Sequence, residues 1–354
     1  MSTKKITVLI VDDSALIRQM LTKMLESDPN IAVLGTAPDP ITAREMIKRL
    51  NPDVLTLDIE MPKMDGLAFL EKIISLRPMP VVMISSLTQE GADVALQALE
   101  LGAVDYVAKP TCDLQHGLEK KTAEIISKVK TASRARVFPK TKSPVAKAPL
   151  SYSRYKSTEQ IILMGASTGG VEALKEIITV LPPNSPAMMV TQHMPATFTT
   201  SFAQRLNQIS KVTVCEASAG QRVLPGHVYI APGGKHMELA RSGANYICRL
   251  HDGPLVSGHK PSVDILFNSG AKTAGANAVG VILTGMGRDG ASGLLNLRKS
   301  GAHTIGQDEA SSIVYGMPKV AFECGAVEKQ YPLSKIASEI FNCLEGFDTK
   351  AIRI

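Results

Sequence analysis

Short hydrophobic runs alternate with amphipathic stretches over roughly the first 125 residues of the chain. The runs are rich in β-branched residues, and the stretches between them carry apolar residues at helical spacing. This alternation predicts an α/β domain with a parallel sheet, and five strands fit the flavodoxin-like doubly wound order. The expected strands are Ile6–Val11, Ile31–Thr36, Val54–Leu57, Val81–Ile84 and Val104–Val107, and the expected helices are Ala15–Leu25, Ile41–Leu50, Leu67–Leu76 and Asp93–Leu101.

A second alternating region begins at Gln160 and runs to the end of the sequence. It predicts a second α/β domain with a doubly wound, mainly parallel sheet. Within it, the runs His236–Ala240 and Tyr246–Leu250 flank Arg241–Ala244 and predict an inserted β-hairpin. The other expected strands are Ile161–Met164, Ala187–Thr191, Val212–Cys215, Val228–Ile230, Val279–Leu283 and Ala302–Ile305.

The hydrophobic pattern disappears between the two regions, where Ser-Pro and Lys-Ala-Pro steps and repeated lysines predict a linker. We therefore expect a first domain over residues 1–130, a linker over 131–157 and a second domain over 158–354. Residues 120–156 hold 11 Lys and Arg against one acid, so this segment contributes about +10 to the charge of the chain. The net charge is +6, so the remaining residues together contribute about −4. Because the basic charge is confined there, we interpret it as a solvated linker and expect no nucleic-acid partner.

Composition excludes several further classes of protein. Hydrophobic content of 44% and charged content of 20% are ordinary for a globular chain. The five cysteines form no CxxC pair, so a zinc ribbon is not supported. No apolar run reaches the roughly 20 residues that span a membrane, and the chain opens without a signal-peptide pattern. We expect a cytoplasmic monomer with no membrane insertion.

Charged and hydroxyl residues follow four strands of the first predicted sheet. Because the carboxyl ends of parallel strands meet at one edge, we expect these residues to lie close together. Crowded carboxylates there would bind Mg²⁺, a hard cation that prefers oxygen ligands. Asp58 would then be the nucleophile that accepts a phosphoryl group. The residues are Asp12, Asp13, Asp58, Ser85 and Lys109.

The runs Val8–Asp13 and Leu57–Gly66, together with Lys109-Pro110, resemble the response-regulator receiver family. The resemblance implies that Asp58 is phosphorylated by a histidine kinase. It also implies that Asp12, Asp13, Asp58 and the backbone carbonyl of Glu60 hold Mg²⁺. Lys109 would pair with the phosphoryl group, Ser85 (in preference to Ser86) would contact it after transfer, and the Lys109–Pro110 bond would be cis.

A second candidate site follows strands of the second domain. Gly165–Gly169 fits the G-x-S-x-G pattern between a strand and a helix near Val171–Val180, and places Ser167 at the helix N-terminus. His193 and Asp289 also follow strands, so the three side chains can converge as nucleophile, base and orienting acid. Backbone N–H groups at Met286 and Thr168 could stabilise an oxyanion. A glycine-rich phosphate-binding loop is an alternative interpretation of the same turn.

Four segments resemble the catalytic domain of the bacterial chemotaxis protein-glutamate methylesterase family, the CheB family. The resemblance implies a phosphorylation-activated serine hydrolase that demethylates γ-glutamyl methyl esters and deamidates glutamines on cytoplasmic helices of methyl-accepting chemoreceptors. It implies the roles given above for the serine, histidine and aspartate, and no cofactor at the esterase site. The segments are Gly165–Gly170, Gln192–Pro195, Ile230–His236 and Leu283–Gly290.

Other output domains remain as alternatives at this point. A transcriptional regulator would need a basic recognition-helix domain, whereas the second domain has an α/β pattern. A nucleotide-binding domain would need a Gly-Lys-Ser/Thr ending that the Gly165–Gly170 turn lacks. A scaffold with a decayed site is a third alternative. The six remaining histidines lack metal-ligand spacing, so we expect surface or hairpin roles for them; they are His116, His227, His236, His251, His259 and His303.

Overall fold

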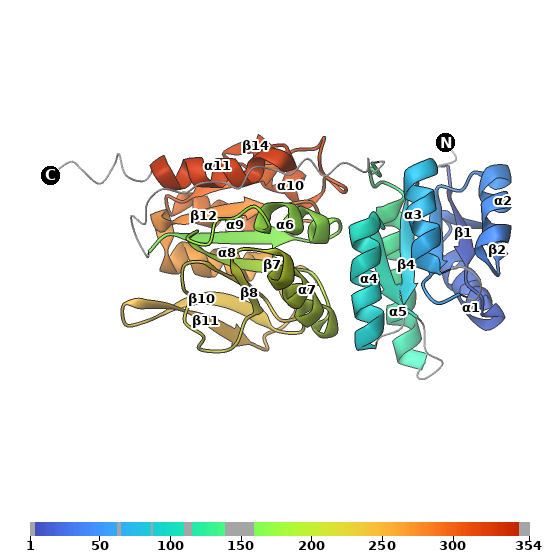
Figure 1. Ribbon diagram of the computed structural model, residues 1–354, viewed down its shortest axis with the longest axis horizontal. Helices are drawn as coiled ribbons and strands as arrows, with labels where there is room; N and C mark the ends of the chain where they lie inside the picture. Colours follow the sequence, from blue (N-terminus) through green and yellow to red (C-terminus); the bar gives the residue numbers. More distant parts are fainter. Residues whose placement is uncertain (1–3, 62–64, 86–87, 110–114, 139–158, 347–354) are drawn as a thin grey trace. The chain divides into compact units, whose positions relative to one another are not determined.

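The computed structural model describes residues 4–61, 65–85, 88–109, 115–138 and 159–346 of the chain (Figure 1). Close packing divides the chain into two compact units, Met1–Ser143 and Pro144–Ile354, and each is described by itself. The division falls inside the predicted linker, 131–157. Most of that linker lies outside the described residues, so its bounds stay a prediction.

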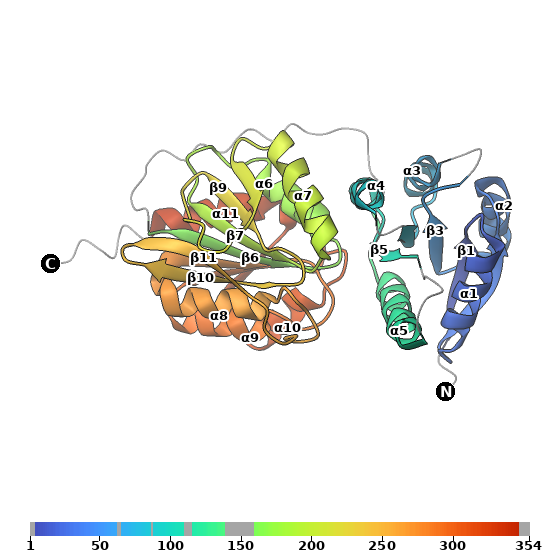
Figure 2. The same cartoon turned by 90° about the horizontal axis from the view of Figure 1, so that it is seen from below.

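The first unit contains a five-stranded parallel sheet with the strand order β2-β1-β3-β4-β5. In Figure 2, helices α1 and α5 lie on one face of this sheet and α2, α3 and α4 on the other. The predicted flavodoxin-like fold is therefore confirmed. The elements are β1 (Ile6–Val11), α1 (Ala15–Glu26), β2 (Ile31–Ala37), α2 (Pro40–Leu50), β3 (Val54–Asp58), α3 (Gly66–Leu76), β4 (Val81–Ser85), α4 (Gln89–Leu101), β5 (Asp105–Ala108) and α5 (Gln115–Ala132).

Polar side chains fix where the helices of this unit begin. Asp39 accepts hydrogen bonds from the N–H groups of Ile41 and Thr42 at the start of α2. Ser14 and Thr88 cap α1 and α4 in the same way. Each cap satisfies backbone donors that the first helical turn leaves unpaired, so the loops between strand and helix end at defined residues.

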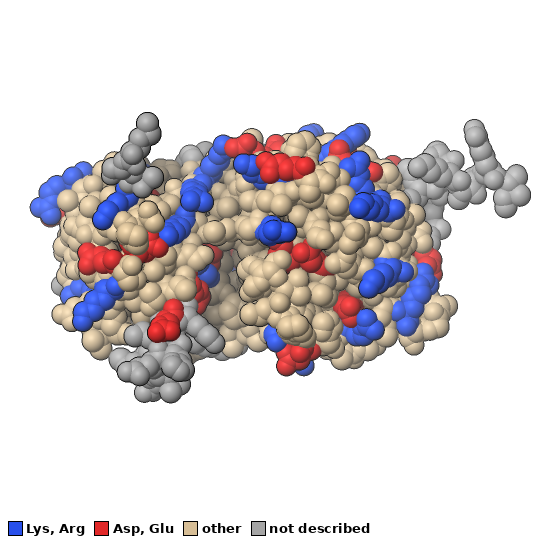
Figure 3. Space-filling view, turned by 180° about the vertical axis from the view of Figure 1, so that it is seen from behind, with Lys and Arg blue, Asp and Glu red and all other residues tan. Residues whose placement is uncertain are grey.

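Helix α5 corrects the sequence-based interpretation of the basic segment. Residues 120–132 are helical, and Lys121, Lys128 and Lys130 among them pair with acids of the same unit. Lys128 binds Asp105 at 2.9 Å and lies over the ring of Tyr106, and Lys130 binds Asp28. On the face of the molecule in Figure 3, basic and acidic side chains of the described residues are interspersed. The positive charge of this helix is therefore partly balanced by nearby acids. The sequence alone had assigned that charge to a solvated linker.

The second unit contains a seven-stranded sheet of parallel strands in the order β14-β13-β12-β6-β7-β9-β8, and a separate antiparallel hairpin, β10-β11. The predicted doubly wound sheet with an inserted hairpin is confirmed. The elements are β6 (Ile161–Ala166), α6 (Gly170–Ile178), β7 (Ala187–Gln192), α7 (Ala196–Ile209), β8 (Thr213–Glu216), β9 (His227–Ile230), β10 (His236–Ser242), β11 (Asn245–His251), α8 (Val263–Thr273), η1 (Gly275–Asn277), β12 (Ala278–Ile282), α9 (Ala291–Lys299), β13 (His303–Gln307), α10 (Met317–Glu323), β14 (Lys329–Tyr331) and α11 (Leu333–Gly346).

Helices cover both faces of the second sheet. Figure 2 shows α8, α9 and α10 on one face and α6, α7 and α11 on the other. Strands β6, β7 and β12 are buried along their whole length and are mostly apolar, as is typical of parallel strands that are covered on both faces. The three strands are neighbours at the middle of the sheet, so the loops that follow them meet at one edge. No helix in the described parts of the chain is long and apolar enough to cross a membrane.

Candidate functional site

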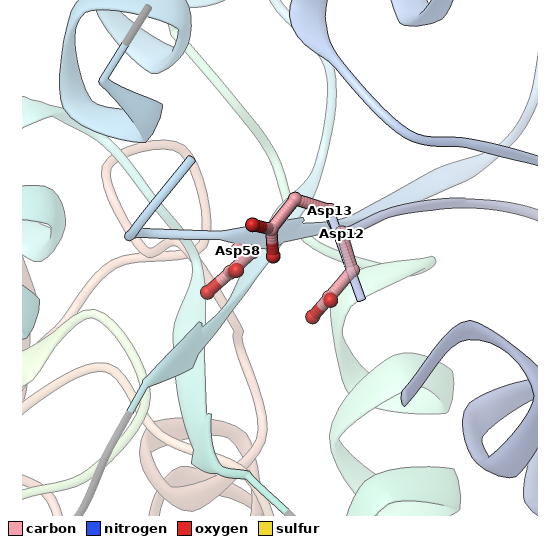
Figure 4. A group of neighbouring side chains, drawn as sticks. All are labelled: Asp12, Asp13 and Asp58. Carbon is pink, nitrogen blue, oxygen red and sulfur yellow. The ribbon is translucent and has the colours of Figure 1, made fainter. Parts of the chain in front are cut away.

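An acidic cluster lies at the carboxyl edge of the first sheet. Asp12 and Asp13 follow β1, and Asp58 ends the neighbouring strand β3. One oxygen from each carboxylate lies within 4.8 Å of the others, and Figure 4 shows the three side chains gathered at the ends of these strands. Asp12 and Asp58 are fully buried, whereas Asp13 is exposed.

The cluster has too little positive charge to balance three carboxylates. Lys109 Nζ binds Asp58 Oδ2 at 2.8 Å and lies 4.0 Å from Asp12 Oδ2. Asp12 Oδ1 accepts the Ser14 N–H, but its Oδ2 is buried and has no hydrogen-bond partner. An unpartnered buried oxygen between carboxylates is what a divalent cation would satisfy, so the donor set fits Mg²⁺.

Burial dominates the protonation of these groups. Loss of water around the carboxylate, together with the charge of Asp12, raises the pKa of Asp58 to about 6, although Lys109 opposes the shift. Burial likewise raises the pKa of Asp12. Glu60, the further predicted ligand through its carbonyl, donates its N–H to Asp58 Oδ1 at 3.4 Å.

The remaining predicted residues of this site lie on the adjacent strand ends. Ser85 ends β4, and its buried hydroxyl donates to the carbonyl of Gly91 in α4 at 3.0 Å. The N–H of Lys109 donates to the carbonyl of Ser85 at 2.7 Å, which ties the two loops together. Ser86 and Pro110 lie outside the described residues, so the choice between the two serines and the cis bond stay predictions.

A second group of predicted residues gathers at the carboxyl edge of the other sheet. Ser167 follows β6, His193 follows β7, and Asp289 lies in the turn between β12 and α9. The N–H of His193 donates to the carbonyl of Ala166 at 3.2 Å, and the N–H of Ser167 donates to that of Thr284 at 3.0 Å. These bonds extend the ladder between neighbouring strands into the loops and hold the loops together.

A direct bond joins two of the three predicted residues. His193 Nε2 lies 2.8 Å from Asp289 Oδ2, and both side chains are buried. Because an ionised carboxylate only accepts, Nε2 carries the proton and Nδ1 is left with a lone pair. His193 Nδ1 is buried without a hydrogen-bond partner. Among the described residues the Ser167 hydroxyl makes no hydrogen bond to it, so the structure brings these two together only through adjacent strand ends.

The N-terminus of helix α8 holds Asp289, a feature that sequence analysis missed. Its carboxylate accepts from the Ser262 hydroxyl at 2.8 Å and from the N–H groups of Val263 at 2.7 Å and Asp264 at 3.2 Å. Burial alone would raise the pKa of Asp289, but His193 and these donors outweigh it and lower the pKa to about 2. Asp289 is therefore ionised throughout the neutral range.

Helices α8 and α9 cap each other through two aspartates. Asp289, just before α9, accepts from the first turn of α8, and Asp264 of α8 accepts the N–H of Gly293 in α9 at 2.6 Å. The signal in the sequence was the serine and aspartate that open α8, Ser262 and Asp264, which are typical of a helix N-terminus. Nothing in the sequence indicated which loop would provide the partner.

The glycines of the Ser167 turn have packing reasons of their own. Gly169 has a φ of 79°, and a Cβ there would meet Ile313 at 2.7 Å. A Cβ on Gly170 would lie 2.1 Å from the side-chain oxygen of Gln192, whose amide donates to the carbonyls of Ser167 at 3.0 Å and His193 at 3.3 Å. Gly170 thus leaves room for the Gln192 amide that binds the Ser167 carbonyl, and a phosphate is not needed to explain either glycine.

One predicted oxyanion donor, Thr168, lies in this turn, and the other, Met286, lies in the loop between β12 and α9. The carbonyl of Thr168 accepts from the Thr284 hydroxyl at 3.0 Å. Met286 is 38% exposed, and the preceding Gly285 is anchored because its N–H binds the Val314 carbonyl at 3.0 Å. The peptide groups of Thr168 and Met286 therefore belong to fixed loops, as an oxyanion site requires, and their roles stay predictions.

One histidine departs from the expected surface or hairpin roles, and it is His259. His236 lies in the hairpin as expected, where it is fully buried and its Nε2 lies 2.8 Å from the carbonyl of Pro254. His259 is stacked on His193, with ring centroids 3.6 Å apart and planes 7° from parallel. Sequence patterns carry no sign of this contact, because the two residues are 66 positions apart and His259 lies in a loop.

The fold and the two sites define a class of protein. A flavodoxin-like unit with a buried acidic cluster and a lysine shares a chain with an α/β unit in which a His–Asp pair lies beside a serine turn. Such a chain is a response regulator with a hydrolase-type output unit. Residues 8–120 match the family model "Response regulator receiver domain", and residues 162–340 match "CheB methylesterase".

Full-length relatives carry both parts. The chain is 52% identical to a protein-glutamate methylesterase/protein-glutamine glutaminase 1 of Geobacter metallireducens, with all of both chains covered. It is 54% identical to a protein of the same activity name from Chromohalobacter salexigens over 98% of each chain. The crystal structure of the Thermotoga maritima CheB methylesterase catalytic domain aligns with a TM-score of 0.51 and 37% identity, over 52% of this chain and 97% of that one. The chain belongs to the CheB methylesterase family, which does not favour the nucleotide-binding, DNA-binding or scaffold interpretations.

Proposed function

We propose that this chain is a phosphorylation-activated protein-glutamate methylesterase and protein-glutamine glutaminase that acts on the cytoplasmic helices of methyl-accepting chemoreceptors. The observation that carries the proposal is the buried pair of His193 and Asp289 at 2.8 Å, placed at the strand ends beside Ser167. The activity names of the relatives support the same reaction. Ser167 is the nucleophile, His193 the general base and Asp289 the orienting acid.

The reaction is acyl transfer through the serine. Ser167 Oγ attacks the side-chain carbonyl of the substrate as its proton passes to His193 Nδ1, the nitrogen that Asp289 leaves free. Asp289, ionised and held by the α8 N-terminus, stabilises the imidazolium without taking its proton. N–H groups at Thr168 and Met286 stabilise the negative charge on the substrate oxygen.

Collapse of this intermediate breaks the bond to the leaving group. His193 returns the proton to the departing oxygen or nitrogen, so methanol leaves from an ester and ammonia from an amide. A water molecule, deprotonated by the same histidine, then releases a γ-glutamate and restores Ser167. Amide cleavage depends more on proton transfer, because an amide ion is a far poorer leaving group than methoxide. No cofactor is needed for these steps.

The acidic cluster of the first unit performs the regulatory chemistry. Asp58 attacks the phosphorus of a histidine kinase phosphohistidine and forms an acyl phosphate, and the kinase imidazole leaves. Lys109, already 2.8 Å from Asp58, pairs with the transferred group. Ser85 exchanges its bond to Gly91 for one to the phosphoryl oxygen, which draws the β4–α4 loop inward. Asp12, Asp13, Asp58 and the Glu60 carbonyl would hold Mg²⁺, which neutralises phosphoryl charge when bound.

Phosphorylation of Asp58 controls the hydrolase, and the first unit restrains it until then. The test is methanol release from methylated receptor by the full chain, with and without a small acyl phosphate donor and Mg²⁺. We expect release to rise with the donor, and Ser167→Ala to abolish release while Asp58 is still phosphorylated. A fragment without residues 1–150 should be more active than the unphosphorylated full chain. Methanol release by Ser167→Ala at the rate of the unchanged chain would contradict the proposal.

A further inference from the structure

His259 contacts the predicted general base over the whole face of its ring. The centroids of His259 and His193 are 3.6 Å apart and the planes are 7° from parallel, which is full face-to-face contact. Asp289 holds the Nε2 edge of His193, and only 7% of the His193 side chain is exposed. One contact thus fixes an edge of the imidazole and the other fixes its plane.

A tight turn presents His259 to this ring. Val256 and His259 exchange both backbone hydrogen bonds, at 3.1 and 2.9 Å. The two residues between them have positive φ angles, 52° at Ser257 and 83° at Gly258, as a two-residue hairpin turn of this type requires. The N–H of Gly234 donates to the carbonyl of Lys260 at 3.2 Å and anchors the turn to the loop after β9. The position of His259 is therefore built by backbone bonds and does not depend on its side chain.

The same segment reaches the other side of the histidine–aspartate pair. Three residues after His259, the Ser262 hydroxyl donates to Asp289 at 2.8 Å, and the N–H of Val263 follows at 2.7 Å. Residues 256–264 thus contact His193 through one side chain and Asp289 through the start of α8. Because this one segment contacts both groups, it can fix the angle between the imidazole of His193 and the carboxylate of Asp289. Residues that surround catalytic groups commonly orient them in this way.

The charge of His259 suits a place against a ring that becomes cationic. Burial, with the nearby charge of His193, lowers the pKa of His259 to about 4, although Asp289 opposes the shift. His259 is therefore neutral at pH 7, and His193 and Asp289 are the titratable groups that act on it. A neutral π face attracts a cation, whereas a second charged imidazole would repel it.

We propose that His259 is a positioning residue for the hydrolase reaction: its neutral ring holds the plane of His193 with Nδ1 toward Ser167 and stabilises the imidazolium formed when Ser167 is deprotonated. The proposal rests on the role of His193 as the general base. It assigns His259 no contact with substrate and no proton transfer of its own. Loss of His259 should lower kcat and leave KM nearly unchanged, because the stacking interaction becomes stronger only as His193 becomes charged.

The test compares three replacements in the full chain, phosphorylated by a small acyl phosphate with Mg²⁺. His259→Phe keeps an aromatic face, His259→Leu keeps volume without one, and His259→Ala removes both. We expect kcat for methanol release to fall about five- to tenfold in the Leu and Ala variants with little change in KM, and the Phe variant to recover most of it. His303→Ala, at the opposite end of its strand from the site, is the control.

A spectroscopic measurement separates positioning from mere packing. In ¹⁵N-histidine spectra, His193 of the unchanged chain should be the Nε2–H tautomer with a single sharp set of ring signals. The Leu and Ala variants should keep this tautomer, which Asp289 sets, but show broadened or multiple ring signals because the plane of the ring is no longer held. Equal losses of kcat in the Phe and Leu variants, or a kcat and ring signals unaltered in the Leu variant, would overturn the proposal. His193→Gln tests the proposed function separately from the role of His259. If this variant retains full activity, the assignment of His193 as the general base is wrong as well.

Discussion

Asp58 and Asp289 have the same burial and opposite electrostatics. Both are about 0–1% exposed and both lie at the carboxyl edge of a parallel sheet. Yet the pKa of Asp58 is raised to about 6, whereas the pKa of Asp289 is lowered to about 2. The difference lies in the donors: Asp58 has one lysine and a long bond from Glu60, and carboxylates beside it.

The comparison explains how one chain uses the same side chain for two tasks. Asp289 accepts three bonds from the start of α8 and one from His193, so its charge is fully compensated and fixed. Asp58 is left incompletely compensated, and its charge depends on what binds to it. A compensated carboxylate can orient a base, and an uncompensated one can respond to a cation or a phosphoryl group.

The largest effect is expected from removing the fixed charge. Asp289→Asn keeps the shape of the side chain but cannot hold His193 in the required tautomer, so kcat for methanol release should fall by about 10³-fold or more. Ammonia release from receptor glutamines should fall further, since it depends more on proton transfer. Both rates can be measured on the same receptor preparation. A kcat within tenfold of the unchanged chain would show that Asp289 only caps α8.

A smaller effect should follow from removing one donor to the same carboxylate. Ser262→Ala deletes the 2.8 Å bond to Asp289 but leaves the two backbone donors. We expect kcat to fall about five- to tenfold, because one hydrogen bond to a charged group is lost. Ser300→Ala removes a hydroxyl that donates to the Leu297 carbonyl at 2.7 Å, away from Asp289, and is the matched control. Equal kcat values for the two variants would contradict the importance of this donor.

The ionised, incompletely compensated Asp58 should lower the stability of the first unit at neutral pH in the absence of metal. The folded pKa of Asp58 lies above its ordinary value of 3.8, so without metal the stability of the first unit falls as pH rises from about 4 to 6. Asp58→Asn resembles the protonated form. It should raise the free energy of unfolding by about 1–2 kcal/mol at pH 7.5 without Mg²⁺. Hydrogen exchange of the β3 and β4 amides in the full chain measures this, and faster exchange in the variant would refute it.

The smallest effect concerns competition between protons and Mg²⁺. Because Asp58 titrates near pH 6, about three quarters of it is protonated at pH 5.5, and Mg²⁺ affinity should be about fourfold weaker there than at pH 7.5. Calorimetric titration of Mg²⁺ at the two pH values measures the ratio. The ratio should approach one in Asp58→Asn if this aspartate is the competing group.

Sequence patterns predicted the central strands of both sheets well because these strands are buried on both faces, whereas the short, partly exposed edge strand β14 was missed. A short continuous apolar run such as that of β6, bounded by polar and glycine residues, is typical of a buried strand, so its ends can be placed within a residue or two. The order of the strands in the second sheet could not be derived in the same way, since it depends on contacts between distant segments. Helix α5 was partly missed because its lysines, paired in the fold with Asp28 and Asp105, resemble a linker when read alone.

The convergence of candidate site residues could be predicted where a residue ends a strand or directly follows one. Asp12, Asp58, Ser167 and His193 all do so, and the edge of a parallel sheet gathers such positions regardless of strand order. The residues that tune these groups could not be found in this way. The hydroxyl of Ser262 and the ring of His259 belong to a loop. A loop has no hydrophobic periodicity, so its sequence does not predict which residues it will contact.

The reciprocal capping of α8 and α9 bears on how members of this family can be compared. Asp289 is the proposed orienting acid of the hydrolase and also satisfies the first turn of α8, while Asp264 satisfies the first turn of α9. A descendant that lost its hydrolytic activity would still be under selection to keep Asp289 for folding. The Ser167 side chain has no such second task among the hydrogen bonds of the described residues. In a divergent chain, the serine is therefore the more informative mark of a working enzyme, and the aspartate alone is a weak one.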